Sequence, residues 1–210
     1  MTMSQYILVP TYHALRQKWR HLKWRVSELE VLDPRYWQTQ RWITRHRDRY
    51  RGRRCFILGN GPSLRYTDLS LLKHEITFGS NRIYLAFPRM GFYTTFLGCI
   101  DPLIVGAIAD ELASLPMPLI TSWRNRHRFR GSQKRNIVYL NTDRDGFSTD
   151  LTRGAAEGYT VTYLLMQVAY YMGFGCVILV GVDHSWSIPT STSRRRLMST
   201  GRDEDHFVAH

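Results

Sequence analysis

The residue types best suited to binding a ligand lie in one short turn, 59–63, with the sequence Gly-Asn-Gly-Pro-Ser. It follows the apolar run 55–58, which has the length and composition of a buried strand. Gly59 and Gly61 allow a ligand to approach the main chain closely. The side chains of Asn60 and Ser63 can hydrogen-bond a ligand or cap the next turn. We therefore expect this turn, with its main-chain amides, to form part of a nucleotide site; the alternative is an ordinary strand-to-helix turn.

Three further groups of polar residues occupy comparable positions along the chain. Asn81 follows a predicted strand, Thr160 and Thr162 stand at the start of an apolar helix, and Asp183 with His184 follows another strand. In a parallel sheet the carboxyl ends of the strands share one edge. The groups after strands are therefore expected to converge, with the 59–63 turn, on one crevice.

The helix that begins near Thr160 is expected to hold an anion. Its first amides and the positive end of its dipole favour negative charge by about 0.3–1 kcal/mol when exposed. The hydroxyls of Thr160 and Thr162 can add donors to a phosphate, and Asn81 can bind a phosphate or ribose oxygen. The alternative for Thr160 and Asn81 is that each simply caps a helix.

Acid–base chemistry is predicted at two places. Asp183 at a strand end can hold a divalent cation or a ribose hydroxyl, and His184 can transfer a proton near neutral pH, although a histidine after a strand is more often structural. His206 closes the acidic run 203–206 (Asp-Glu-Asp-His), a second candidate for a base or metal group, with a solvated tail as the alternative. The basic run 124–130 can contact phosphates or form a solvated loop.

Alternating apolar runs and amphipathic segments position these residues. Strands are predicted over 55–58, 75–79, 94–100, 118–122, 136–140 and 176–181. Helices are predicted over 35–50, 67–73, 82–87, 102–114 and 161–172. This alternation indicates an α/β, Rossmann-like fold with a mostly parallel sheet flanked by helices.

A basic helical segment is expected to precede that sheet. Residues 1–54 carry thirteen Lys/Arg against four Asp/Glu, which accounts for +9 of the net charge of +12. Residues 12–31 have apolar side chains at helical spacing. They predict a basic amphipathic helix that either docks on its own domain or lies on an anionic membrane surface. We accordingly divide the chain into a segment 1–54 and a nucleotide-binding domain 55–210.

Composition narrows the function classes. No apolar run is long enough for a membrane span, and the N-terminus lacks a signal-peptide pattern, so a cytoplasmic location, with peripheral contact to the inner membrane face as an option, is expected. Cys55, Cys99 and Cys176 are predicted to be reduced core thiols. The chain has no GxGxxG fingerprint, P-loop, nucleophile elbow or specific nucleic-acid motif.

Three motifs together resemble a known family. FILGNGPSL, ITFGSNRIYLAF and GYTVTYLLMQVAYYMGFGCVILVGVDHSW, in this order, are similar to the bacterial MptE-like domain proteins over residues 50–207. That family is named for an archaeal 6-hydroxymethyl-dihydropterin pyrophosphokinase. More distantly, the pattern is similar to bacterial CMP-sialic-acid-dependent sialyltransferases. Both resemblances imply a Rossmann-like fold, a nucleotide as the small-molecule donor, with a leaving phosphate, and a small-molecule acceptor.

The resemblances differ in the group transferred. The sialyltransferase likeness implies a CMP-sugar donor bound at Asn60, Ser63, Asn81 and the Thr160–Thr162 region, with a histidine such as His206 as base. The pyrophosphokinase likeness implies ATP, Mg²⁺ with Asp183 as a ligand, and a pterin alcohol. Glycosyl transfer is favoured slightly over diphosphate transfer, and a non-catalytic adaptor is the third alternative. The resemblance also implies further domain beyond residue 207, so a C-terminally truncated chain is expected.

Overall fold

A computed structural model describes residues 30–130 and 136–183, and these contain a parallel sheet of six strands. The strands are β1 (Arg54–Leu58), β2 (Thr77–Ser80), β3 (Phe96–Gly98), β4 (Leu119–Ser122), β5 (Ile137–Leu140) and β6 (Cys176–Val180). Their order is β5-β4-β3-β2-β1-β6, and every neighbouring pair is parallel. The predicted α/β fold class is confirmed.

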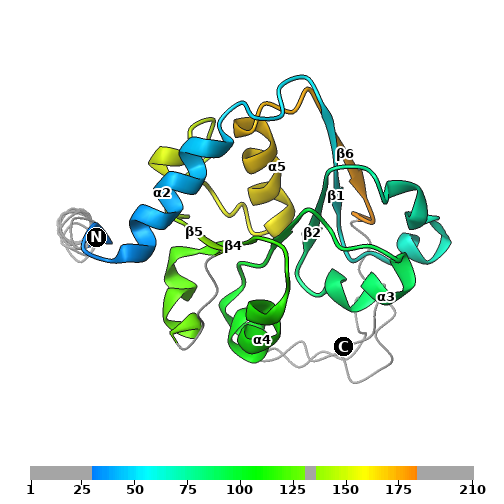
Figure 1. Ribbon diagram of the computed structural model, residues 1–210, viewed down its shortest axis with the longest axis horizontal. Helices are drawn as coiled ribbons and strands as arrows, with labels where there is room; N and C mark the ends of the chain where they lie inside the picture. Colours follow the sequence, from blue (N-terminus) through cyan, green and yellow to red (C-terminus); the bar gives the residue numbers. More distant parts are fainter. Residues whose placement is uncertain (1–29, 131–135, 184–210) are drawn as a thin grey trace, which may run out of the picture.

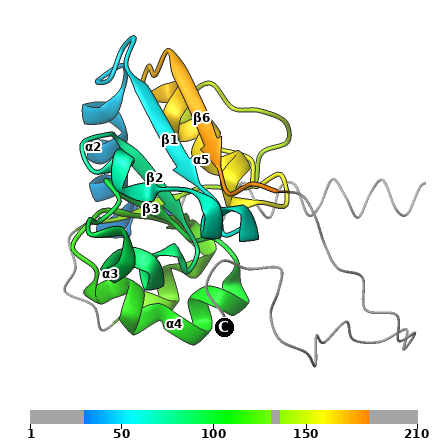
Figure 2. The ribbon, with the colours of Figure 1, turned by 90° about the vertical axis from the view of Figure 1, so that its right-hand side faces the viewer.

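Helices cover both faces of this sheet (Figures 1 and 2). Helices α2 (Pro34–His46) and α5 (Val161–Tyr171) lie on one side, while α3 (Phe87–Met90) and α4 (Pro102–Ser114) lie on the other. Each face has its own apolar cluster: Leu164 and Leu165 of α5 belong to one, and Val105 and Leu112 of α4 to the other. The domain is therefore a three-layer sandwich with two cores.

The strand order changes direction at β1. Strands β1 to β5 step one way across the sheet, and the chain then returns through α5 to place β6 on the other side of β1. Right-handed crossovers explain why α5 covers the face opposite to α4, since reversing the direction of stepping reverses the face. Such a reversal leaves a crevice beyond the carboxyl ends of β1 and β6.

Helix α2 begins within one residue of its predicted start at 35, but it ends at His46, before the predicted end at 50. Asp33 caps it by accepting the amide hydrogen of Arg35 at 2.9 Å, and Pro34 occupies its first turn. Buried Thr39 accepts the amide hydrogen of Tyr139 at 3.0 Å, so the helix also pairs the outer edge of β5. The predicted division of the chain at residue 54 stays a prediction, although Ile43 of α2 belongs to the core.

Two predicted helices differ from the structure. In place of one helix over 67–73, there are 3₁₀ helices at Pro62–Tyr66 and Leu69–Leu72; the stretch 82–87 becomes a 3₁₀ turn, Ile83–Ala86, followed by α3. Pro62 begins the first of these 3₁₀ helices and Pro88 lies in the first turn of α3, and neither proline can donate a backbone hydrogen bond. The basic run 124–130, predicted as a loop, lies mostly in the 3₁₀ helix Trp123–Phe129.

The amphipathic helix predicted over 12–31 lies almost wholly outside the described residues, as do His184 and His206. Within the described ranges, none of the helices combines the length and apolarity needed to span a bilayer.

Cysteine exposure follows strand position. Cys55 and Cys99 are buried, and burial raises the pKa of each thiol to about 12. Cys176 is exposed because it begins the edge strand β6, so its prediction as a core thiol is wrong. All three are free thiols, as expected.

We expect a thiol reagent at about pH 8 to label one cysteine in the folded protein and three after unfolding, because a buried thiol with a raised pKa supplies little thiolate. Mass spectrometry after labelling checks this. A Cys176→Ser variant should remain unlabelled while folded; fast labelling of Cys55 or Cys99 in the folded state would contradict the structure.

Candidate functional site

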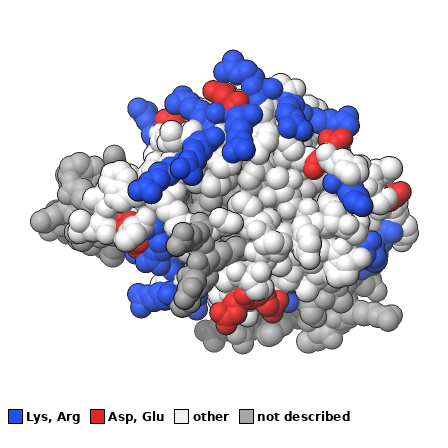
Figure 3. Space-filling view, in the orientation of Figure 1, with Lys and Arg blue, Asp and Glu red and all other residues white. Residues whose placement is uncertain are grey.

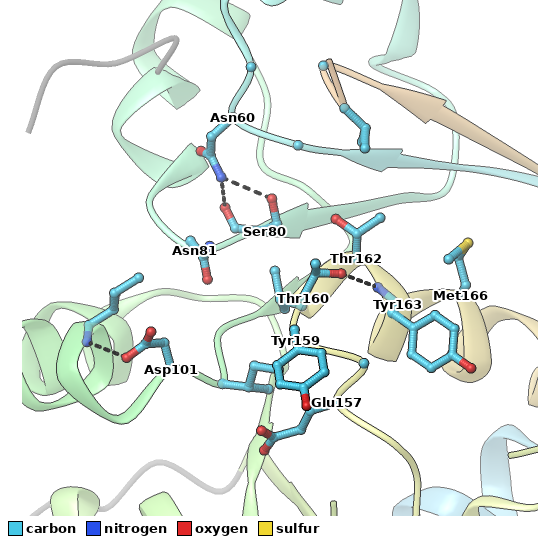
Figure 4. Close-up of a pocket in the computed structure, with 18 of the residues that line it drawn as sticks. Asn60, Ser80, Asn81, Asp101, Glu157, Tyr159, Thr160, Thr162, Tyr163 and Met166 are labelled. Atoms are coloured by element: carbon cyan, nitrogen blue, oxygen red, sulfur yellow. Dashed lines mark hydrogen bonds between the residues drawn. The ribbon is translucent and has the colours of Figure 1, made fainter. Parts of the chain in front are cut away.

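A cavity of about 730 Å³ lies at the carboxyl edge of the sheet, at the reversal between β1 and β6. Its lining comes from the segments that follow β1, β2, β3, β4 and β6 and from the start of α5 (Figure 4). Its size is that of ordinary small-molecule sites. The described members of the four groups of polar residues singled out in the sequence therefore meet at one place.

The cavity brings most of the predicted binding residues together. Those that line it are Gly59, Asn60, Gly61, Asn81, Thr160, Thr162 and Asp183. Ser63 lies just behind and binds Asp183. The predicted catalytic residues His184 and His206 lie outside the described residues. The roles assigned to all of these residues stay predictions.

The 59–63 turn is built differently from the expected phosphate loop. The amide of Gly59 donates to the carbonyl of Val180 at 2.8 Å, and the amide of Gly61 donates to the carbonyl of Gly181 at 2.8 Å. Ser63 donates its amide to the Asp183 carboxylate, and Pro62 has no amide hydrogen. Three of the expected amide donors are thus already paired with β6 and the residues after it, and the turn fastens β1 to β6.

Glycine is needed in this turn because the segment after β6 approaches it closely. A Cβ atom at Gly59 would lie 2.1 Å from the carbonyl oxygen of Gly181, and one at Gly61 would lie 2.4 Å from an oxygen of Asp183. Gly181 itself has a positive φ of 70° and faces the side chain of Leu64. The glycines therefore permit close approach, as predicted, but the approaching group is the protein's own backbone.

The side chain of Asp183, in the segment after β6, binds Ser63 of this turn. Its Oδ2 accepts the amide hydrogen of Ser63 at 2.8 Å and its Oδ1 accepts the hydroxyl hydrogen at 2.5 Å. No group of three His, Cys, Asp or Glu side chains within the described part of the chain is close enough to hold a metal ion. Mg²⁺, however, is commonly held by only one or two carboxylates together with substrate phosphates. Asp183, the ligand that the pyrophosphokinase resemblance implies, lines the cavity with both carboxylate oxygens hydrogen-bonded to Ser63, and its role as a metal ligand stays a prediction.

Two asparagines occupy the rim formed by β1 and β2. Asn60 donates its amide hydrogens to the carbonyl and hydroxyl oxygens of Ser80, each at 3.0 Å, which leaves its Oδ1 as an acceptor (Figure 4). Asn81 is left-handed, with φ 48°, and its backbone amide donates to Gly98 at 2.7 Å. It lines the cavity and does not cap the following helix, whose cap is Arg82.

The start of α5 forms the opposite side of the cavity. The hydroxyl oxygen of Thr160 accepts the amide hydrogen of Tyr163 at 3.0 Å, so the capping alternative for Thr160 holds. The first amides of a helix have no partner within the helix, and here they open on the cavity lined by Val161 and Thr162. A helix start with free amides favours an anion such as a phosphate, and that role for this end of α5 stays a prediction.

Several lining residues were not assigned from the sequence. Asp101 caps α4 through the amides of Leu103 (2.7 Å) and Ile104 (3.4 Å), and Asp101-Pro102 after a predicted strand was a usable signal for it. Glu157 forms an ion pair with Arg124 and accepts the hydroxyl hydrogen of Thr142 at 2.7 Å. No sequence pattern indicates that Glu157 contacts Arg124 and Thr142, since these residues lie far apart in the chain.

The segments that line this cavity lie within a region that matches a known family. The family model described as "6-hydroxymethylpterin diphosphokinase MptE-like" matches residues 37–189. No curated protein sequence matches the chain.

A solved structure of the MAf glycosyltransferase from Magnetospirillum magneticum AMB-1 is similar, with a TM-score of 0.45 and 16% identity. The match covers 80% of this chain and 30% of that chain. This chain therefore corresponds to less than a third of that protein's length. Because a likeness at this level does not establish a shared fold, nothing about activity is taken from it.

Proposed function

The chain belongs to the 6-hydroxymethylpterin diphosphokinase MptE-like family, and from that premise we propose that it is a nucleotide-dependent transferase whose donor binds in the cavity between β1, β2 and α5. The observation that carries the proposal is the convergence of Asn60, Asn81 and Thr160 on one cavity at the reversal of strand order. Open parallel sheets bind nucleotides at such a reversal.

Within the cavity, the donor phosphate is assigned to the start of α5. The helix dipole and unpaired amides favour an anion there, and the hydroxyls of Thr160 and Thr162 add donors. The Oδ1 of Asn60 and the side-chain amide of Asn81, on the opposite rim, are assigned to ribose oxygens (Figure 4). The paired amides of the 59–63 turn hold the rim in place.

For the group transferred, we favour a glycosyl group from a CMP-type nucleotide sugar. In that reaction the bond between the sugar's anomeric carbon and the phosphate oxygen breaks, and an acceptor oxygen bonds to that carbon. The α5 amides stabilise the charge on the departing phosphate. A base, assigned to His184 or His206, removes the acceptor's proton. Diphosphate transfer from ATP to a pterin alcohol is the alternative, with Asp183 as the proposed Mg²⁺ ligand.

A second candidate is a non-catalytic adaptor that binds an anionic membrane surface. The observation in its favour is a row of exposed arginines that runs from the last turn of α2 to the residue before β1. Its members are Arg45, Arg47, Arg49, Arg51 and Arg53. Figure 3 shows Lys and Arg side chains gathered along that edge of the molecule, which is the amino edge of the sheet and faces away from the cavity.

A thermal-shift screen of CMP, UDP, GDP and ATP, each with and without Mg²⁺, tests the proposal. A nucleotide at 100 times its Kd should stabilise the protein by about 2.7 kcal/mol. A shift with ATP only in the presence of Mg²⁺ would favour diphosphate transfer. No shift with any nucleotide, together with salt-sensitive sedimentation on anionic vesicles, would favour the adaptor.

The rim asparagines give a sharper test. We expect Asn60→Ala combined with Asn81→Gly to weaken nucleotide binding about 30-fold by calorimetry, because two ligand hydrogen bonds are lost. Glycine at 81 keeps the left-handed backbone relaxed. Asn136→Ala, an exposed asparagine at the amino edge of the sheet, serves as the control. Equal affinity in the double variant and the wild type would refute the proposed rim.

A further inference from the structure

An aromatic residue in an unfavourable backbone conformation stands beside the proposed phosphate position. Gly158 and Tyr159 are both left-handed, with φ angles of 52° and 61°. A left-handed conformation suits glycine, whereas for a bulky side chain such as that of Tyr159 it is a rare and costly state. Such a conformation persists only where the surrounding structure holds it.

The neighbours of Tyr159 supply that restraint. The amide of Thr160 donates to the carbonyl of Glu157 at 3.0 Å, which closes a tight turn around residues 158 and 159. Glu157 is itself fixed by its ion pair with Arg124. At Gly158, a Cβ atom would lie 2.3 Å from the Tyr163 ring, so the turn also fits closely against α5.

Nothing in the packing of the protein accounts for a tyrosine at this position. Tyr159 is fully exposed, at 105% of its reference area, although it lines the cavity. Its neighbour Tyr163 contacts Phe147 in an edge-to-face pair, whereas no ring contact is found for Tyr159 among the described residues. Tyr159 therefore has an unfavourable backbone conformation, and burial of its side chain does not offset the cost of that conformation.

We propose that Tyr159 is the stacking surface for the planar base of the bound nucleotide. The proposal rests on the proposed function and deepens it by assigning the base to one side of the cavity. In Figure 4 the Tyr159 ring lies on the α5 side, next to Thr160 and across from Asn60. Tyr159 lines the same cavity as Thr160 and Asn81, the residues assigned to the phosphate and the ribose.

The apolar part of the cavity lining supports the same placement. Ile100, Ile104 and Val161 line the cavity alongside Tyr159. A ring on a tight, restrained turn loses little freedom when a ligand stacks on it, which makes an exposed tyrosine an effective platform. Stacking tolerates any base, so Tyr159 contributes affinity, and the polar rim decides which nucleotide is preferred.

The test compares three substitutions at position 159 by calorimetry with CMP and, in parallel, ATP. Tyr159→Phe keeps the ring and should bind with a Kd close to that of the wild type. Tyr159→Leu and Tyr159→Gly remove the ring and should raise Kd about tenfold. Ribose 5-phosphate, which has no base, should bind all four proteins equally. A separate titration with the pterin alcohol as the only ligand tests whether the stacked ring is a pterin or a nucleobase.

Thermal unfolding without ligand supplies an independent measure. Tyr159→Gly relaxes the left-handed backbone, so its Tm should equal or exceed that of the wild type, whereas Tyr159→Leu should not gain. A higher Tm together with weaker nucleotide binding in Tyr159→Gly would show that Tyr159 serves ligand binding and not the stability of the fold.

The outcomes separate the two proposals. If wild-type protein binds none of CMP, UDP, GDP and ATP, the proposed function and the stacking role both fail. If it binds any of them and Tyr159→Leu binds equally well, only the stacking role fails. Equal losses for ribose 5-phosphate and nucleotide would also overturn the stacking role, because they would show that Tyr159 acts through the turn. Tight binding of the pterin alcohol that depends on the ring, with no base-dependent loss for nucleotides, would assign the ring to a pterin instead.

Discussion

Replacing Gly59 by alanine is expected to lower the free energy of unfolding by about 3 kcal/mol and to abolish nucleotide binding. The added methyl group would lie 2.1 Å from the carbonyl oxygen of Gly181 and 2.8 Å from its carbonyl carbon. Both atoms belong to backbone, which cannot rotate away as a side chain can. Gly59 also donates its amide to Val180, so β1 and β6 would have to separate where they form the cavity rim. Denaturant unfolding and calorimetry measure the two effects.

Gly106→Ala in α4 is the matched control for this change. The methyl group there would meet only the guanidinium end of Arg128, at 3.1 Å, and that flexible side chain can move. Because alanine is the better helix former, Gly106→Ala should be neutral or stabilising by up to about 1 kcal/mol. A loss below about 1 kcal/mol in Gly59→Ala would contradict the close approach of β6 to the turn.

Gln167→Leu is expected to destabilise the protein by about 3 kcal/mol, because it leaves buried backbone groups without partners. Fully buried Gln167 accepts the amide hydrogens of Ser148 and Ala156, both at 2.9 Å, through Oε1. Its Nε2 donates to the carbonyls of Ala156 (2.8 Å) and Tyr163 (3.0 Å). One side chain thus ties the irregular segment before α5 to the helix.

The same substitution should weaken nucleotide binding, since the tied segment leads directly to Glu157, Tyr159 and Thr160. Leu164→Met is the control: it changes a fully buried side chain on the same helix at nearly constant volume and should cost less than about 1.5 kcal/mol. Denaturant unfolding compares the two variants. If Gln167→Leu is no less stable than Leu164→Met, the hydrogen-bond network does not hold this segment.

The strands and the two long helices of the domain could be predicted from local sequence, because each has a clear period or an apolar run with a cap. Asp101-Pro102 opens α4 and Thr160 opens α5, where the sequence places both helices. The connections after β1 and β2 were each predicted to contain one helix, and they instead form 3₁₀ helices, with the short helix α3 following the one after β2. The way these segments turn depends on what they pack against, since Leu64, Leu69 and Ile83 are buried in the core, and such packing is not a local property.

What the sequence determined by itself is the set of polar residues that follow strands and their placement on one edge, because parallel strands necessarily share their carboxyl edge. Only the tertiary structure decided what those residues contact. Because β6 lies beside β1, the amides of Gly59 and Gly61 are hydrogen-bonded to the carbonyls of Val180 and Gly181. The turn that was expected to bind a phosphate therefore joins β1 to β6. The proposed function therefore assigns the ligand to the start of α5 and Tyr159, because strand order, which no local pattern encodes, determines which backbone groups are already paired.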